Sequence, residues 1–210
     1  MDENSFHHQQ VVLVRHGETE WALEGRHTGR TDVPLTERGR QQAVALGRLL
    51  ERQQFANVLV SPRQRALETC RLAGFGEVAE IRDDLAEWDY GEYEGRTTED
   101  ILAERPGWTL WVDGVAGGET VEDVGRRVDR VIAEVRSTPD DVAIFAHGHV
   151  LRILAARWLD LAPKDGRLFA LDPGGVSVLG YEHTWPVLAR WNENLINADE
   201  EDRHDIAAAF

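Results

Sequence analysis

Two histidines that directly follow apolar runs are the first residues with clear chemical potential. Val11–Val14 runs into Arg15 and His16, and Val142–Ala146 runs into His147. Short apolar runs of this kind are typical of strands covered on both faces of a parallel sheet. Because ligands bind outside the carboxyl ends of such strands, we expect both histidines to face one crevice.

A third apolar run, Asn57–Val60, leads to Arg63 and Arg65 at a predicted helix start. Backbone N–H groups and the helix dipole favour an anion at that place. Arginine also matches the geometry of phosphate oxygens in a bidentate contact. The sequence therefore predicts a cluster of arginines and histidines at one end of the sheet: Arg15, Arg65, His16 and His147.

Such a cluster suits phosphoryl transfer. Arginines stabilise the non-bridging oxygens of a phosphoryl group. A neutral imidazole attacks phosphorus, and neighbouring arginines lower its pKa and keep it neutral near pH 7. The second imidazole, when cationic, would stabilise charge in the transition state. We predict no cofactor and no metal site: His147 and His149 have the spacing of a metal pair, but no third ligand accompanies them.

Composition narrows the class of protein. The chain has 210 residues, 42% of them hydrophobic and 29% charged, and its formal net charge is −15. No apolar run approaches the roughly 18 residues of a membrane helix. The negative charge argues against nucleic-acid and anionic membrane partners. The polar N-terminus and the single cysteine, Cys70, predict a protein without secretory signal or internal disulfide and with a cytoplasmic location.

Predicted strands and helices alternate along the chain. We expect helices that begin at Thr36, at Ser61–Pro62, at Thr120 and near Val150, between the three strands above. A hairpin over residues 176–181 and 187–191 closes the pattern. This order predicts an α/β fold, a three-layer α/β/α sandwich whose mainly parallel central sheet carries helices on both faces. Residues 1–195 form one predicted domain, and residues 196–210 form an acidic, flexible tail.

Five motifs in order along the chain resemble those of the histidine phosphatase superfamily, which has the phosphoglycerate mutase-like fold. The motifs span Val11 to about Arg152 and include both strand-end histidines. They are Val14-Arg15-His16-Gly17-Glu18-Thr19, Gly29 to Gly39, Ser61 to Thr69, Leu85 to Gly91 with Glu94-Gly95, and Ala146 to His149. Within the superfamily the chain looks most similar to the sugar-phosphate and acid phosphatase branch.

The resemblance implies a role for each catalytic residue. His16 is implied to attack phosphorus and become phosphohistidine, and Glu87 to protonate the leaving alkoxide and then activate water. Arg15, Arg65 and His147 are implied to bind the phosphoryl oxygens. The resemblance and the neighbouring sequence also give a set of candidate substrate-binding residues: Glu18, His27, Thr28, Gly29, Tyr90, Gly148 and His149.

The predicted function is hydrolysis of small phosphate monoesters, such as sugar phosphates, by a metal-independent phosphatase. The alternative is transfer of the phosphoryl group by a phosphoglycerate mutase. Mutases of the family typically carry asparagine where this chain has Ala22, and a cation-rich insertion where it has Gly95–Gly118 with two arginines. These differences favour a hydrolase. Trp108 and Trp111 in that segment indicate either a small core under a loop or a substrate lid.

Two hypotheses that place the protein in another functional class stay open: a pseudoenzyme that binds phosphoesters, and a metal-dependent hydrolase. The complete set of Arg15, His16, Arg65, Glu87 and His147 argues against the first. The expected partner is a small phosphorylated metabolite, and a homodimer is compatible with the sequence.

Overall fold

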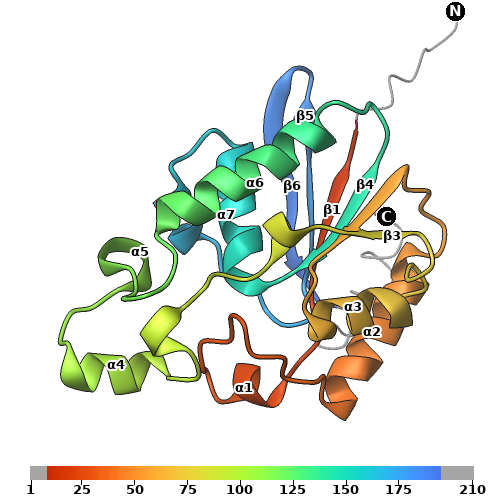
Figure 1. Cartoon of the computed structure of the whole chain (residues 1–210). Coiled ribbons are helices and arrows are strands. Elements are labelled where there is room, and N and C mark those ends of the chain that lie inside the picture. Colours follow the sequence, from red (N-terminus) through yellow and green to blue (C-terminus); the bar gives the residue numbers. More distant parts are fainter. Residues whose placement is uncertain (1–8, 195–210) are drawn as a thin grey trace, which may run out of the picture.

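The computed structural model describes residues 9–194, which form one six-stranded sheet with helices on both faces (Figure 1). The strands lie in the order β3-β2-β4-β1-β5-β6. Their bounds are Val11–Arg15 for β1, Asn57–Val60 for β2, Ala79–Ile81 for β3, Val142–Ala146 for β4, Val176–Glu182 for β5 and Trp185–Glu193 for β6. The predicted acidic tail lies outside the described residues.

The sheet is mostly parallel. Strand β4 pairs in parallel with β1 and β2, and β2 pairs in parallel with β3. Strands β5 and β6 form the predicted hairpin and add two antiparallel pairs at one edge. The α/β fold with a mainly parallel central sheet and helices on both faces, predicted from the alternating pattern, is therefore confirmed.

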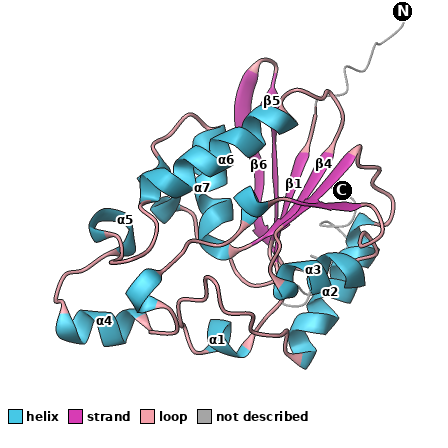
Figure 2. Cartoon of the chain, viewed as in Figure 1, coloured by secondary structure: helices cyan, strands magenta, loops and turns pink. Residues whose placement is uncertain are grey.

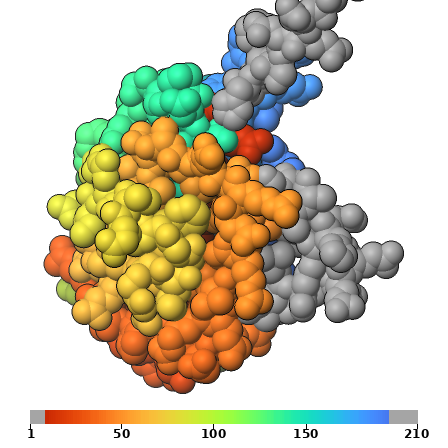
Figure 3. Space-filling model, turned by 90° about the vertical axis from the view of Figure 1, so that its right-hand side faces the viewer, coloured from red at the N-terminus to blue at the C-terminus, as the bar shows by residue number. Residues whose placement is uncertain are grey.

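Alternating side chains of β1 separate two hydrophobic cores. Val11 and Leu13 belong to the core beneath α6 (Val121–Val135) and α7 (Gly148–Trp158). Val12 and Val14 belong to the core beneath α2 (Glu37–Leu50) and α3 (Gln64–Leu72). Figure 2 shows these helix pairs on opposite sides of the strands, and Figure 3 shows the face that α2 and α3 cover. Both sheet faces are thus closed, which fixes the strand ends rigidly.

The long helices begin where capping chemistry predicts. The Thr36 hydroxyl accepts the Gly39 N–H at 3.0 Å and starts α2. Thr120 and Asp123 form a reciprocal capping box that starts α6. Among the described residues, no helix has the length and apolar character needed to cross a membrane.

The prediction that Ser61–Pro62 starts a helix is wrong in detail, because α3 begins at Gln64 after Arg63. The Ser61 hydroxyl turns inward instead. The structure also contains three short helices between the predicted elements: α1 (Glu20–Leu23), α4 (Thr98–Glu104) and α5 (Leu110–Asp113). Single 3₁₀ turns cover Asp83–Leu85 and Gly91–Tyr93, and a longer one covers Pro163–Leu168.

Candidate active site

The residues that follow strands β1, β2 and β4 lie side by side at one edge of the sheet. Arg15 at the end of β1 is in register with Ala146 at the end of β4, and Val60 of β2 is in register with Phe145. The carboxyl ends of these parallel strands therefore coincide. The residues that emerge there are His16, Ser61 and His147, as the sequence predicts for the two histidines.

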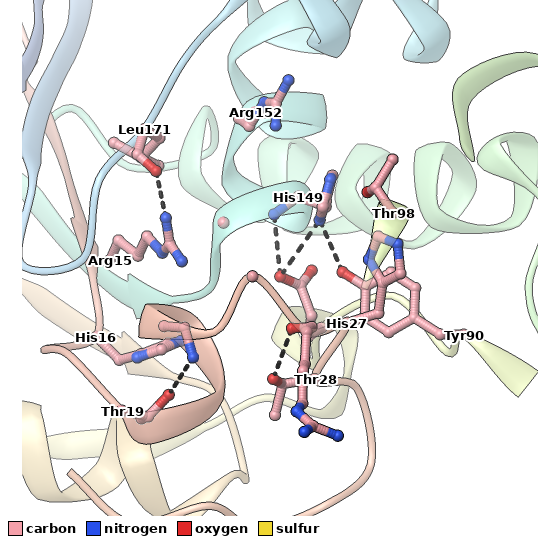
Figure 4. A pocket seen from close by; sticks show the side chains of 15 residues that line it. Arg15, His16, Thr19, His27, Thr28, Tyr90, Thr98, His149, Arg152 and Leu171 are labelled. Carbon is pink, nitrogen blue, oxygen red and sulfur yellow. Dashed lines mark hydrogen bonds and ion pairs between the residues drawn. The ribbon is translucent and has the colours of Figure 1, made fainter. Parts of the chain in front are cut away.

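A pocket of about 240 Å³ opens above these strand ends (Figure 4). Its strand-end side contains Arg15 and His16. Its opposite side, called here the aromatic side, contains His27, Tyr90 and His149. Glu87, Thr28, Thr98 and Gly148 also line the pocket. In Figure 4 the Leu171 carbonyl lies beside Arg15, from which it accepts a hydrogen bond, and Arg152 lies above His149. One cavity thus joins two differently built walls.

The environment of His16 defines which nitrogen can react. Its Nδ1 lies 2.7 Å from the Gly17 carbonyl oxygen, which can only accept. Nδ1 therefore carries the proton, and Nε2 keeps its lone pair. Burial lowers the pKa of His16 well below 6.5, and Arg65 and Arg15 lower it further. The direction of the shift agrees with the neutral imidazole predicted from the neighbouring arginines, and burial is its larger cause.

Arg65 is buried behind the pocket wall and holds a loop and a histidine together. Its Nε donates to His147 Nδ1 at 3.1 Å. Its terminal nitrogens donate to the backbone oxygens of Thr31 at 2.9 Å, Thr28 at 2.8 Å and Gly29 at 3.2 Å. The guanidinium therefore shapes the Thr28–Gly29 loop and supplies positive charge next to His16.

His147 has both ring nitrogens occupied. Because Nδ1 accepts from Arg65, Nε2 carries the proton and donates to the Ser61 hydroxyl at 2.6 Å. Burial and Arg65 lower the pKa of His147 well below 6.5. The condition under which the second imidazole would act as a cation is therefore not met in the free site, because burial and Arg65 favour its neutral form. Its ring centroid lies 5.1 Å from that of His16.

Glu87 projects into the pocket with its carboxylate fixed by the backbone. Three N–H groups donate to it, from Trp88 at 2.9 Å and from His149 and Val150 at 3.0 Å each. The last two belong to the first turn of α7, where the helix dipole also attracts negative charge. The carboxyl group therefore has one orientation between the two sides of the pocket.

The aromatic side is held by ring contacts. The Tyr90 hydroxyl lies 2.7 Å from His149 Nδ1, and the rings of His27 and Tyr90 are 4.8 Å apart. Burial and Arg152 lower the pKa of His149 well below 6.5. This side of the pocket therefore presents neutral rings, in contrast to the arginine-rich strand ends.

Five of the seven candidate substrate-binding residues line the pocket, and Arg65 and His147 of the catalytic set lie buried directly behind it. Glu18 and Gly29 are the two substrate-binding candidates that do not line it. The Glu18 carboxylate accepts the Thr36 hydroxyl at 2.8 Å and lies 3.9 Å from Arg38. Gly29 turns its carbonyl to Arg65. Both residues support the walls from outside the lining.

Sequence reasoning missed Ser61, Arg152 and Thr98. Ser61 was interpreted as a helix cap, although its place directly after a strand was a usable signal. Arg152 lies three positions after His149 on α7, a spacing that places both on one helix face. Thr98 had no such signal, because it begins an unpredicted short helix. No group of three or more histidine, cysteine or acidic side chains within residues 9–194 is arranged to hold a metal ion.

Comparisons with known proteins agree with this geometry. Residues 11–194 match the family model of the histidine phosphatase superfamily, branch 1. An acid phosphatase of Mycobacterium tuberculosis is 42% identical over 178 residues, which cover 83% of this chain and 87% of that protein. A sedoheptulose 1,7-bisphosphatase of Saccharomyces cerevisiae is 34% identical over 93% of this chain and 97% of its own.

A 2,3-bisphosphoglycerate-dependent phosphoglycerate mutase of Gloeobacter violaceus is 34% identical over 73% of this chain and 77% of its own. A solved Mycobacterium tuberculosis structure superposes with a TM-score of 0.85 at 40% identity, covering 89% of this chain and 98% of that one. The match extends over the whole described fold and includes both strand-end histidines. The chain therefore belongs to branch 1 of the histidine phosphatase superfamily and is a phosphatase of that family.

Proposed function

We propose that the chain hydrolyses small phosphate monoesters, sugar phosphates or related metabolites, through a phosphohistidine on His16. One observation carries the proposal: the hydrogen bond from Nδ1 to the Gly17 carbonyl leaves Nε2 unprotonated in a pocket bordered by Arg15. An imidazole in this tautomer is a ready nucleophile, and the arginine offers charge to the phosphoryl oxygens.

In the first step, the Nε2 lone pair of His16 forms the nitrogen–phosphorus bond while the phosphorus–oxygen ester bond breaks. Glu87, which is protonated while it faces the dianionic phosphoryl group of the bound ester, gives its proton to the leaving alkoxide. Arg15 and Arg65 stabilise the negative charge on the non-bridging oxygens. His147 donates from Nε2 to a phosphoryl oxygen when that oxygen replaces the Ser61 hydroxyl as acceptor.

In the second step, a water molecule attacks phosphorus from the side that the alcohol has left. Glu87, now a carboxylate, takes a proton from this water, and the nitrogen–phosphorus bond breaks. His16 regains its lone pair and phosphate departs. The balance of protons closes without a metal ion, so we expect activity to survive dialysis against a strong chelator.

Hydrolysis is favoured over phosphoryl relocation by the walls of the pocket. Ala22 lines the pocket, and Thr98 is the residue of segment 95–118 that lines it. Both arginines of that segment are engaged elsewhere: Arg96 pairs with Glu104 at 2.7 Å, and Arg105 donates to the Tyr93 hydroxyl at 2.9 Å. A second anionic group of a reorienting substrate would find no cation from this segment.

The decisive experiment measures phosphate released from a panel of phosphorylated metabolites, with chelator present. In parallel, 3-phosphoglycerate and a bisphosphoglycerate primer are supplied and 2-phosphoglycerate is quantified. We expect phosphate release to exceed mutase turnover for the best ester. Efficient formation of 2-phosphoglycerate, or strict restoration of activity by a divalent metal, would reject the proposal.

A further inference from the structure

His27 contains a buried polar atom without a hydrogen-bond partner in the described part of the chain. The atom is Nε2, and the residue is only 8% exposed and lines the pocket. Buried polar atoms are almost always paired, because leaving one unpaired is costly. An orphaned imidazole nitrogen at a pocket wall therefore indicates that a bound molecule completes it.

The position of His27 is built into the fold. Its backbone N–H donates to the Arg96 carbonyl at 2.9 Å, and its own carbonyl accepts the Gly95 N–H at 2.8 Å. The ring packs 4.8 Å from Tyr90 and 5.9 Å from Trp108. Main-chain bonds and ring contacts on two sides prevent the imidazole from turning away. The nitrogen is thus held ready within the aromatic side.

The aromatic side is where the alcohol part of an ester must lie. Figure 4 shows His27 across the pocket from Arg15 and His16. A phosphoryl group at His16 directs its ester oxygen towards Glu87, whose carboxyl group is fixed between the two sides. The remainder of the leaving group then extends to His27.

The groups on this side fit a hydroxyl better than a charge. Burial lowers the pKa of His27, although Glu94 opposes the shift, so the ring is neutral. A neutral imidazole both donates and accepts, as an alcohol does. The hydroxyls of Thr28 and Thr98 line the same region. They match a polyol in the same way.

The cations near this side are already engaged. Arg26 pairs with the Glu24 carboxylate. Arg152 donates to the Gly166 carbonyl at 3.1 Å, and its guanidinium lies 4.7 Å from the Trp111 ring centroid. Arg26 is thus neutralised by a carboxylate, whereas Arg152 is held in place by a carbonyl and a ring and keeps its charge at the far edge of this side.

We propose that His27 Nε2 hydrogen-bonds a hydroxyl of the leaving group, so that the aromatic side is a subsite for a polyhydroxylated alcohol. The proposal rests on the phosphatase function above and narrows its substrates to polyol and sugar phosphates. It makes His27 a specificity residue for the alcohol, with no part in the attack on phosphorus.

The test compares two esters of equal carbon length, glycerol 3-phosphate and n-propyl phosphate, which differ in two hydroxyls. The quantity measured is the ratio of their kcat/KM values, which cancels any general loss of activity. His27→Phe keeps the ring packing and removes the nitrogen. We expect it to reduce the preference for glycerol 3-phosphate by about 3- to 10-fold, the usual range for one neutral hydrogen bond. His27→Gln, whose amide reaches the Nε2 position, restores part of the preference.

Arg30→Ala is the matched control. Arg30 is 71% exposed, pairs with Asp89 at 2.6 Å and lies outside the pocket lining. Its ratio should equal that of the wild type. An unchanged ratio in a folded His27→Phe variant overturns the subsite, as does equal activity of Phe and Gln variants. If the wild type hydrolyses neither ester nor p-nitrophenyl phosphate, the phosphatase proposal itself has failed; p-nitrophenyl phosphate turnover with an unchanged ratio rejects only the subsite.

Discussion

The two sides of the pocket are built by different means. At the strand-end side, Arg65, His147 and Ser61 form a closed set of hydrogen bonds behind His16, and the nitrogen without a partner among the described residues is Arg15 Nε, which belongs to a pocket-lining cation. At the aromatic side, rings pack against each other and one nitrogen, His27 Nε2, stays unpaired. The first arrangement suits a group of fixed shape that every substrate shares, the phosphoryl group. The second arrangement suits the alcohol part of the ester, which differs between substrates and can form the missing hydrogen bond.

The comparison predicts that a change in the strand-end side affects all esters alike. His16→Ala removes the nucleophile, and we expect turnover of every phosphate ester to fall by about 10⁴-fold or more. Acid-labile labelled phosphate, trapped on the wild type by rapid quenching, should be absent from the variant. Near wild-type turnover, or a wild type without phosphohistidine, would refute the mechanism.

Glu87 stands between the two sides and should distinguish leaving groups. An alkoxide needs a proton to leave, whereas p-nitrophenolate hardly does. Glu87→Gln is therefore expected to reduce hydrolysis of glycerol 3-phosphate by about 10²–10⁴-fold and that of p-nitrophenyl phosphate far less. The ratio of the two kcat values is the measurement. Equal losses on both esters would show that Glu87 positions phosphate or supports α7.

The same contrast explains what could be predicted from the sequence. The strand-end side could be predicted because a parallel strand covered on both faces must be a short continuous run of apolar residues, which is easy to recognise in the sequence. The residue that follows such a run lies at the carboxyl end of the strand, where ligands bind. The threonines at positions 36 and 120 predicted the first residues of α2 and α6 equally well, because threonine is a favoured N-cap. The aromatic side takes His149 from a predicted helix, but its other wall, with Tyr90 and Thr98, depends on short helices and turns between residues 79 and 118, whose positions follow from tertiary contacts rather than periodicity.

The contacts between individual side chains of the site were even harder to predict from the sequence. The inward turn of Ser61 depends on His147, 86 positions away, and the displacement of Glu18 from the pocket depends on Thr36 and Arg38. Pairings of this kind are decided by the packed structure. The neutral state of His147 likewise results from burial, which no local motif reveals.

Ser61 provides a smaller test of the strand-end side. Ser61→Ala leaves the Nε2–H of buried His147 without its acceptor and removes the restraint on the ring. We expect kcat to fall about tenfold, and by the same factor for glycerol and propyl phosphate. Ser61→Thr keeps the hydroxyl and should recover activity. A loss that differs between the two esters would mean that Ser61 influences the alcohol as well, against the division proposed here.

The smallest expected effect concerns the pH dependence of stability, where both sides contribute. His16 and His147 at the strand ends, and His27 and His149 on the aromatic side, all have pKa values below the 6.5 of an exposed imidazole. Below pH 6.5 the unfolded chain therefore binds more protons than the folded one. The stability from these groups is complete above pH 6.5 and is lost as the pH falls from 6.5 through each folded pKa.

His27→Phe removes one of these four groups. Its free energy of unfolding should fall less steeply with decreasing pH than that of the wild type, by up to about 1.4 kcal/mol per pH unit. Urea denaturation at a series of pH values between about 7 and 5 measures the slope for both proteins. Arg30→Ala should retain the wild-type slope. Identical slopes for His27→Phe and wild type would mean that His27 titrates as a free imidazole, and that the aromatic side is open to water rather than closed around an unpaired nitrogen.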